Sequence, residues 1–97
     1  MSRKEIKLLF HKHSRVFFKY GIRKLAIFGS YVRGEDNKKS DIDILVEFKQ
    51  PTFKNYIYLA RELEKIFKRK VDLLTFSSLD RYLKPYILKE AEYIERA

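Results

Sequence analysis

The segment 41–76 constrains the fold of this chain more than any other feature, because it reads as a strand, a helix and a strand in succession. Apolar and polar residues alternate over 41–48, which is the period-two pattern of a strand with one buried face. Apolar residues then recur at helical spacing behind a possible cap at Thr52, and 71–76 is a second apolar strand. A crossover helix of this length predicts two parallel strands that begin at the same edge of a sheet.

The residues before this segment predict a helix and another strand. Ser2 and Glu5 form a capping box, and apolar residues follow at helical spacing as far as Tyr20, where Gly21 stops the helix. Residues 25–28 form a short apolar strand that ends abruptly in a glycine and a serine. If this strand runs antiparallel to the next one, its end meets the starts of the two parallel strands.

The C-terminal residues complete a small α/β (α+β) fold. Ser77 and Asp80 can cap a final helical region, which Pro85 is expected to divide into two pieces. A polar loop over 35–40 separates the first two strands. We therefore expect residues 1–97 to form a single domain, a three-stranded mixed sheet packed by about four helices.

Composition and charge exclude some classes of function and leave others open. The chain contains no cysteine, which excludes disulfides, thiol nucleophiles and cysteine-based metal sites. No apolar run approaches the length of a membrane span, so a cytoplasmic protein with no membrane partner is expected. The formal charge of +9 indicates either an anionic partner, such as nucleic acid or a nucleotide phosphate, or simply a basic soluble surface.

Three acidic residues stand at the predicted starts of the parallel strands. Asp41 and Asp43 leave the same face of one strand, and Asp72 lies near the start of the other. Close carboxylates repel one another by about 1 kcal/mol per pair in water-like surroundings, and by more when they are desolvated. A divalent cation relieves this repulsion, and Mg²⁺ prefers oxygen ligands of this kind. The acids thus predict a Mg²⁺ site, although a lone Asp-x-Asp is more often structural.

A glycine–serine turn supplies the complementary half of the predicted site. Gly29 lets the backbone turn closely, the amides and the Ser30 hydroxyl can point at phosphate oxygens, and Arg33 adds a positive charge. Each residue also has an ordinary structural interpretation, and Arg33 could equally brace the turn by pairing with an acidic side chain. Their combination with the acidic residues predicts that Gly29, Ser30 and Arg33 bind a triphosphate.

The sequence GSYVRGEDNKKSDIDILVEF, followed by VDLL at 71–74, resembles the DNA polymerase β-like nucleotidyltransferase superfamily. More closely it resembles the minimal nucleotidyltransferase (MNT) family, whose pattern is Gly-Ser-x-Ala-Arg-Gly and then Ser-Asp-x-Asp. Val32 stands where that family commonly has alanine. The resemblance implies a nucleotidyltransferase fold.

The resemblance also implies the roles of individual residues. Asp41 and Asp43 would bind two Mg²⁺ ions that bridge the triphosphate of ATP, the nucleotide substrate. Asp72 would help to hold the ion that activates the attacking hydroxyl, and Ser30 would contact the terminal phosphates.

For function, the resemblance implies a protein adenylyltransferase. MNT proteins often pair with a HEPN-domain ribonuclease as antitoxin to toxin, and some transfer AMP to a tyrosine of that partner. Two alternatives stay open: a non-catalytic antitoxin that neutralises its partner by binding, and a basic nucleic-acid-binding module. The intact set of three carboxylates favours the enzyme, because a non-catalytic module has no reason to keep repelling charges together.

Aromatic residues near the C-terminus allow two interpretations. Tyr82, Tyr86 and Tyr93 either complete the core or form a docking surface for a partner.

Overall fold

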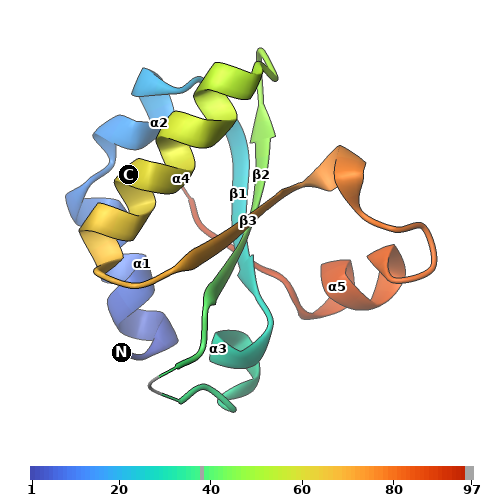
Figure 1. Cartoon of the computed structure of the whole chain (residues 1–97). Helices are drawn as coiled ribbons and strands as arrows, with labels where there is room; N and C mark the ends of the chain where they lie inside the picture. Colours follow the sequence, from blue (N-terminus) through green and yellow to red (C-terminus); the bar gives the residue numbers. More distant parts are fainter. Residues whose placement is uncertain (38, 96–97) are drawn as a thin grey trace.

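The computed structural model describes residues 1–37 and 39–95, and its centre is a four-stranded mixed sheet (Figure 1). The strands are β1 (Ile22–Phe28), β2 (Ile42–Phe48), β3 (Val71–Thr75) and β4 (Glu92–Tyr93). The helices are α1 (Arg3–Lys12), α2 (Arg15–Lys19), α3 (Ser30–Arg33), α4 (Phe53–Phe67), the 3₁₀ helix η1 (Phe76–Ser78) and α5 (Lys84–Glu90). No helix in the described part of the chain is long and apolar enough to cross a membrane.

The sheet has the strand order β3-β2-β1-β4. β2 and β3 are parallel, whereas β1 is antiparallel to β2, so both expectations for the central strands are confirmed. β4 adds a fourth strand to the predicted three; it pairs Tyr93 and Glu92 with Ala26 and Ile27. A two-residue strand leaves no periodic pattern in the sequence, and for this reason it was not predicted. The predicted α/β class holds.

One face of the sheet is covered by α1, α2 and α4 (Figure 1). Alternate residues of β2 point into this layer, where they meet the buried stripe of α4. Phe10 of α1 and Phe67 of α4 pack edge to face, with ring centroids 5.1 Å apart. The largest fully buried side chains of this layer are Phe10, Phe67, Ile6, Ile22, Leu25, Ile27, Ile42, Ile44, Leu59, Leu63 and Val46. This layer is the main core of the domain.

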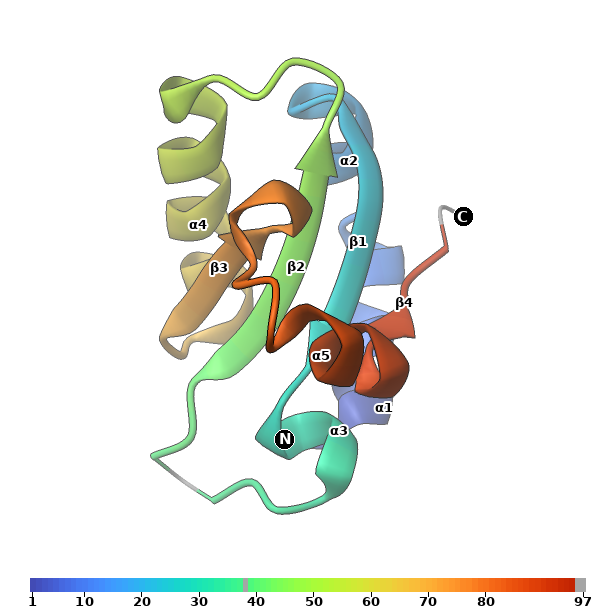
Figure 2. The ribbon, with the colours of Figure 1, turned by 90° about the vertical axis from the view of Figure 1, so that its right-hand side faces the viewer.

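The opposite face, which we call the open face, carries a much smaller core of Ala26, Phe28 and Leu45. Partly buried side chains from β3, η1 and α5 pack against these three residues. Figure 2 looks onto this face and shows α5 and the segment that leads to it in front of the lower part of the sheet. α5 itself contains no fully buried residue. The open face is therefore lightly covered.

Two helical predictions were wrong in detail. The first helix does not continue to Tyr20 but breaks after Lys12, and α2 follows as a separate short helix. α2 packs both Val16 and Phe17 into the core, so its orientation is set by this packing and not by the direction of α1. Pro85 does not divide a helix: it lies in the first turn of α5, where its missing N–H is not needed.

Candidate active site

The predicted site residues meet at one edge of the sheet, where β1 ends and where β2 and β3 begin. Phe28 is paired with Asp43, and Asp43 is paired with Asp72, so these three residues lie at one level across three strands. Gly29 and Ser30 follow directly after β1 at this level. The register of the sheet thus brings the glycine–serine turn and two of the three acidic residues together. We call this region the acidic edge.

Asp43 is a partly buried carboxyl group in an acidic environment. Its pKa is raised from 3.8 to about 6, mainly because burial penalises the charged form and next because the charges of Asp72 and Asp41 repel it. A hydrogen bond with Asp72 adds to the shift, and Arg33 opposes it. The acidic edge therefore holds more negative charge than its own residues neutralise.

Gly29 brings the backbone of the turn directly against Asp43. It is buried and has φ 77° and ψ −151°, a conformation that residues with a side chain rarely adopt. A Cβ at this position would lie 2.1 Å from Oδ2 of Asp43 and 2.9 Å from its Cγ. Only glycine therefore fits here. By contrast, Gly34 also has a positive φ, of 73°, but a Cβ there would meet nothing within 4 Å.

Arg33 lies at the end of α3 and pairs with two carboxylates. Its Nη1 donates to both oxygens of Glu90 at 3.1 Å, and its Nε donates to Glu35 at 3.1 Å. The N–H of Gly29 donates to Oε1 of the same Glu90 at 2.9 Å. The structure thus shows Arg33 as a brace of the turn, which is one of the two roles that the sequence allowed. Glu90 was missed because it lies 57 residues from Arg33 and belongs to no local motif.

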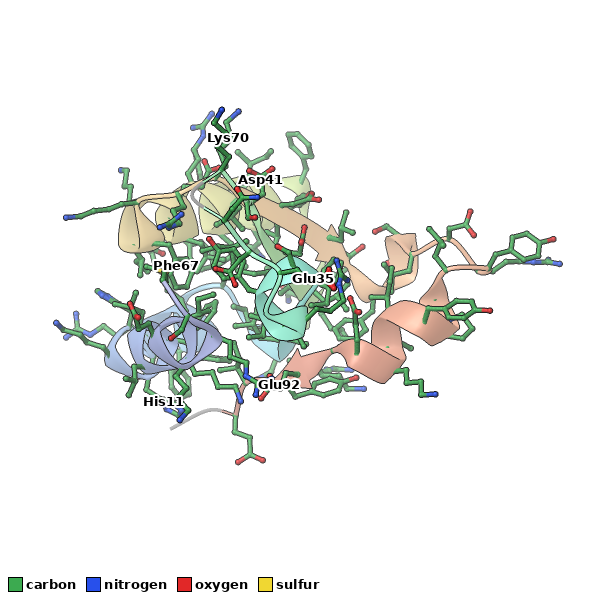
Figure 3. The ribbon with its side chains drawn as sticks, turned by 90° about the horizontal axis from the view of Figure 1, so that it is seen from below. His11, Glu35, Asp41, Phe67, Lys70 and Glu92 are labelled. Carbon is green, nitrogen blue, oxygen red and sulfur yellow. The ribbon has the colours of Figure 1, made fainter. Side chains whose placement is uncertain are left out.

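Asp41 is placed differently from the other two acids. It is exposed and stands one residue before β2, so the register of the sheet does not fix it as it fixes Asp43. It lines a shallow hollow that Lys70, just before β3, also lines (Figure 3).

Within residues 1–37 and 39–95, no three His, Cys, Asp or Glu side chains form a group that could hold a metal ion. The predicted cluster of three carboxylates is therefore not assembled in this structure. Lys38 lies outside the described residues.

The pair of Asp43 and Asp72 nevertheless fits a divalent cation. Mg²⁺ is usually bound by one or two carboxylates, and water and substrate phosphates complete its coordination. The pKa of Asp43 is raised first by burial and next by repulsion from Asp72 and Asp41, and a positive charge at this position would oppose both effects. Asp43 and Asp72 are thus the residues of the acidic edge that could hold Mg²⁺.

Farther along the open face, a groove of about 500 Å³ runs toward the ends of β2 and β3. Phe76, Leu88 and Tyr93 contribute apolar surface to it, and Lys24 and Lys84 add positive charge. The rings of Phe76 and Tyr93 are stacked with centroids 6.2 Å apart.

The C-terminal tyrosines belong to the surface and not to the core. Tyr82 and Tyr86 are 72% and 73% exposed, and Tyr93 is 50% exposed. Leu83, which lies between the first two, is 57% exposed. Large apolar side chains grouped on the surface are typical of an interaction surface. The interpretation as core residues was therefore wrong, and the docking surface stays a prediction.

Comparison with known proteins identifies relatives along almost the whole chain. A family described as the nucleotidyltransferase domain matches residues 12–94. A relative in Methanocaldococcus jannaschii, provisionally named a protein adenylyltransferase, is 45% identical over 92 residues, which cover 91% of this chain and 89% of the relative. The protein adenylyltransferase MntA of Thermococcus cleftensis is 40% identical over 77 residues, which cover 78% of each chain.

Solved structures share the fold. A structure provisionally described as a minimal nucleotidyltransferase has a TM-score of 0.82 with this chain at 27% identity, and the match covers 95% of both chains. One chain of the complex between an MNT antitoxin and a tri-AMPylated HEPN toxin of Shewanella oneidensis has a TM-score of 0.67 at 20% identity. That match covers 93% of this chain and 71% of the other.

Proposed function

This chain belongs to the nucleotidyltransferase domain family, and we propose that it is a Mg²⁺-dependent protein adenylyltransferase that acts on a HEPN-type toxin. In this proposal AMP from ATP is joined to a tyrosine hydroxyl of the toxin, and the chain is the antitoxin. The observation that carries the proposal is the placement of Asp43 beside both Asp72 and the Gly29 turn. Repelling acids held against a phosphate-binding type of turn serve no evident purpose in a protein that only binds a partner.

Each residue of the acidic edge has a distinct part in the proposed reaction. Gly29 and Ser30 hold the terminal phosphates through the backbone and the hydroxyl, and Arg33 adds a charge to this group. Asp43 lies directly against that turn and, with Asp72, would hold Mg²⁺, and the exposed Asp41 would join them only if its side chain turned toward Asp43. When bound, the metal neutralises charge on the phosphates and favours the ionised form of the attacking hydroxyl.

The exposure of Asp72 suits a contact with the acceptor. Asp43 is partly buried behind the turn, whereas Asp72 is open to an incoming group. In the proposed step the tyrosine oxygen forms a bond to the α-phosphorus, and the bond from that phosphorus to pyrophosphate breaks. The proton of the hydroxyl passes to Asp72. AMP is then attached to the acceptor, and pyrophosphate leaves.

Two observations support a protein acceptor. Relatives at 45% and 40% identity carry the name protein adenylyltransferase, and a neighbour with the same fold is an MNT antitoxin whose toxin partner is AMPylated. In addition, Tyr82, Leu83 and Tyr86 are exposed, and α5 with the segment that leads to it lies in front of the open face, the face to which Asp43 belongs (Figure 2). A docked partner would cover this surface.

The proposal is tested by mass spectrometry of the intact proteins. The chain is incubated with Mg²⁺, each nucleoside triphosphate in turn, and the product of the neighbouring gene. We expect the mass of one or more AMP groups on a tyrosine of that partner with ATP, and none with Asp43→Asn. An unmodified partner together with extension of added RNA or DNA would reject the proposal in favour of a nucleic-acid substrate.

A further inference from the structure

The carboxylate of Glu90, the last residue of α5, accepts hydrogen bonds from Gly29 of the glycine–serine turn and from Arg33 at the end of α3. It accepts from the N–H of Gly29 at 2.9 Å and from the guanidinium of Arg33 at 3.1 Å on each oxygen. The side chain is only 28% exposed, so the pair is partly shielded from water. An anion from the C-terminal part of the chain thus lies on the turn that is proposed to bind the nucleotide.

A carboxylate and a phosphate oxygen compete for such donors, because both accept charge-assisted hydrogen bonds with the same geometry. Arg33 presents its Nη1 to Glu90 and its Nε to Glu35, so the guanidinium is engaged on two sides. A triphosphate that is to contact Gly29 and Arg33 must displace at least the contacts of Glu90. The negative charge of Glu90 would also repel the phosphates while it stays in place.

We propose that Glu90 is an internal competitor for the terminal phosphates, and that α5 must release it before the nucleotide binds fully. This inference rests on the proposed nucleotidyl-transfer function. It makes Glu90 a residue that sets the affinity for the nucleotide and couples the position of α5 to occupancy of the site.

α5 is suited to such a release, because little holds it in place. It has seven residues and no buried side chain, and Ile87 and Leu88 are only partly buried against the small core of the open face. Its surface carries the exposed Tyr86. Elements with few buried contacts open locally at a low cost in free energy. A partner that binds this surface would therefore also act on the position of Glu90.

Glu92 provides a matched comparison for Glu90. It lies two residues farther along the chain and pairs with Lys7 and with Arg3 of α1, the latter at 3.4 Å. These contacts tie β4 to α1, and they involve neither Gly29 nor Arg33. Glu92→Gln and Glu90→Gln change the net charge equally, but only Glu90→Gln removes an anion from the turn.

The inference is tested by equilibrium binding of a non-hydrolysable ATP analogue and of inorganic triphosphate to the full chain with Mg²⁺. We expect Glu90→Gln to lower the dissociation constant of both probes by about five- to tenfold, a usual range for coupling between two sites. Glu92→Gln should change it less than about twofold, because Glu92 is paired with Arg3 and Lys7 and does not occupy a donor of the turn. Glu35→Gln, which frees one side of Arg33 but leaves Gly29 engaged, should lie between the two.

The possible outcomes separate the two proposals. If the parent binds the probes and Glu90→Gln binds them equally or more weakly, Glu90 is a structural brace and the inference is wrong. If neither the parent nor any variant binds a nucleotide, the proposed function fails, and the inference fails with it. A thermal melt verifies that each variant is folded. Should Glu90→Gln not fold, Glu90→Asp, which keeps the charge but shortens the side chain that reaches Gly29 and Arg33, should lower the dissociation constant in the same direction by a smaller factor.

Discussion

The two faces of the sheet use the same strands for opposite purposes. On the face covered by α1, α2 and α4, which we call the helical face, Ile42, Ile44 and Val46 of β2 are buried in a large apolar layer. On the open face, Asp43 and Glu47 alternate with Leu45, and only a short helix and its leading segment lie against the sheet. Because successive residues of a strand point to opposite sides, one strand can support the core and the chemistry at once.

This difference indicates on which face of the sheet a domain of this size can keep a side chain that lowers the stability of the fold. Burial of apolar surface in the helical layer supplies most of the stabilisation, so the open face does not have to contribute much. A partly buried acid beside a second acid is unfavourable in the folded protein, as the raised pKa of Asp43 shows. We infer that stability is concentrated on one face and reactivity on the other.

The largest expected effect is on catalysis, and it comes from the open face. Asp43→Asn should lower transfer of AMP by about a hundredfold or more, because the reaction needs charge neutralisation at the phosphates. Glu47→Gln is the matched control: Glu47 lies on the same face of the same strand and pairs with Lys24 at 3.8 Å. It should retain nearly full activity. Equal losses in the two variants would mean that the face as a whole, and not the acidic edge, sets the rate.

The next largest effect is on stability, and it comes from the helical face. Leu63 of α4 is fully buried, and Leu63→Ala should lower the free energy of unfolding by about 3 kcal/mol through lost burial and the cavity left behind. Leu88 of α5 is only partly buried, and Leu88→Ala should cost less than about 1.5 kcal/mol. Urea unfolding measures both values. Similar costs at the two positions would contradict the separation of the faces.

Glycine substitutions give a smaller but sharper contrast. Gly29→Ala combines an unfavourable backbone conformation with a clash against Asp43, and it should cost about 2 kcal/mol and also weaken nucleotide binding. Gly34→Ala has the conformational penalty alone and should cost about 1 kcal/mol, with binding unchanged. Thermal melts and a binding titration check this pair. A Gly34→Ala variant that lost nucleotide binding would show that the flexibility of the turn, and not its contact with Asp43, is what matters.

Much of this arrangement could be predicted from the sequence, because it depends on patterns that are local. Alternation along β2 identified its buried face, and the crossover helix identified β3 as its parallel neighbour. These two features place Asp43 beside Asp72 without any further information. Gly29 was found through the motif to which it belongs.

The features that escaped prediction are those that depend on long-range contacts. β4 has two residues, and it is a strand only because its backbone pairs with β1. Glu90 carries no local signal, and its role depends on where α5 lies against the end of β1. The break between α1 and α2 also leaves no local signal, because α2 is oriented by the packing of Val16 and Phe17 in the core. In each case a tertiary contact decides among local alternatives.

The most direct test of the separation between the faces is the sign of the stability change in Asp43→Asn. In chelator, the folded-state pKa of about 6 lies above the ordinary value of 3.8. The proton on Asp43 therefore stabilises the fold fully below about pH 4, and this contribution is lost as the pH rises through about 6.

Urea unfolding of the parent and of Asp43→Asn at pH 4 and pH 7, both in chelator, measures this contribution. At pH 7 the variant should be as stable as the parent or more stable, by a few tenths to about 1 kcal/mol, and the difference should shrink at pH 4. A variant that is clearly less stable than the parent at pH 7, with transfer of AMP retained, would contradict the account, because Asp43 would then serve the fold and not the reaction.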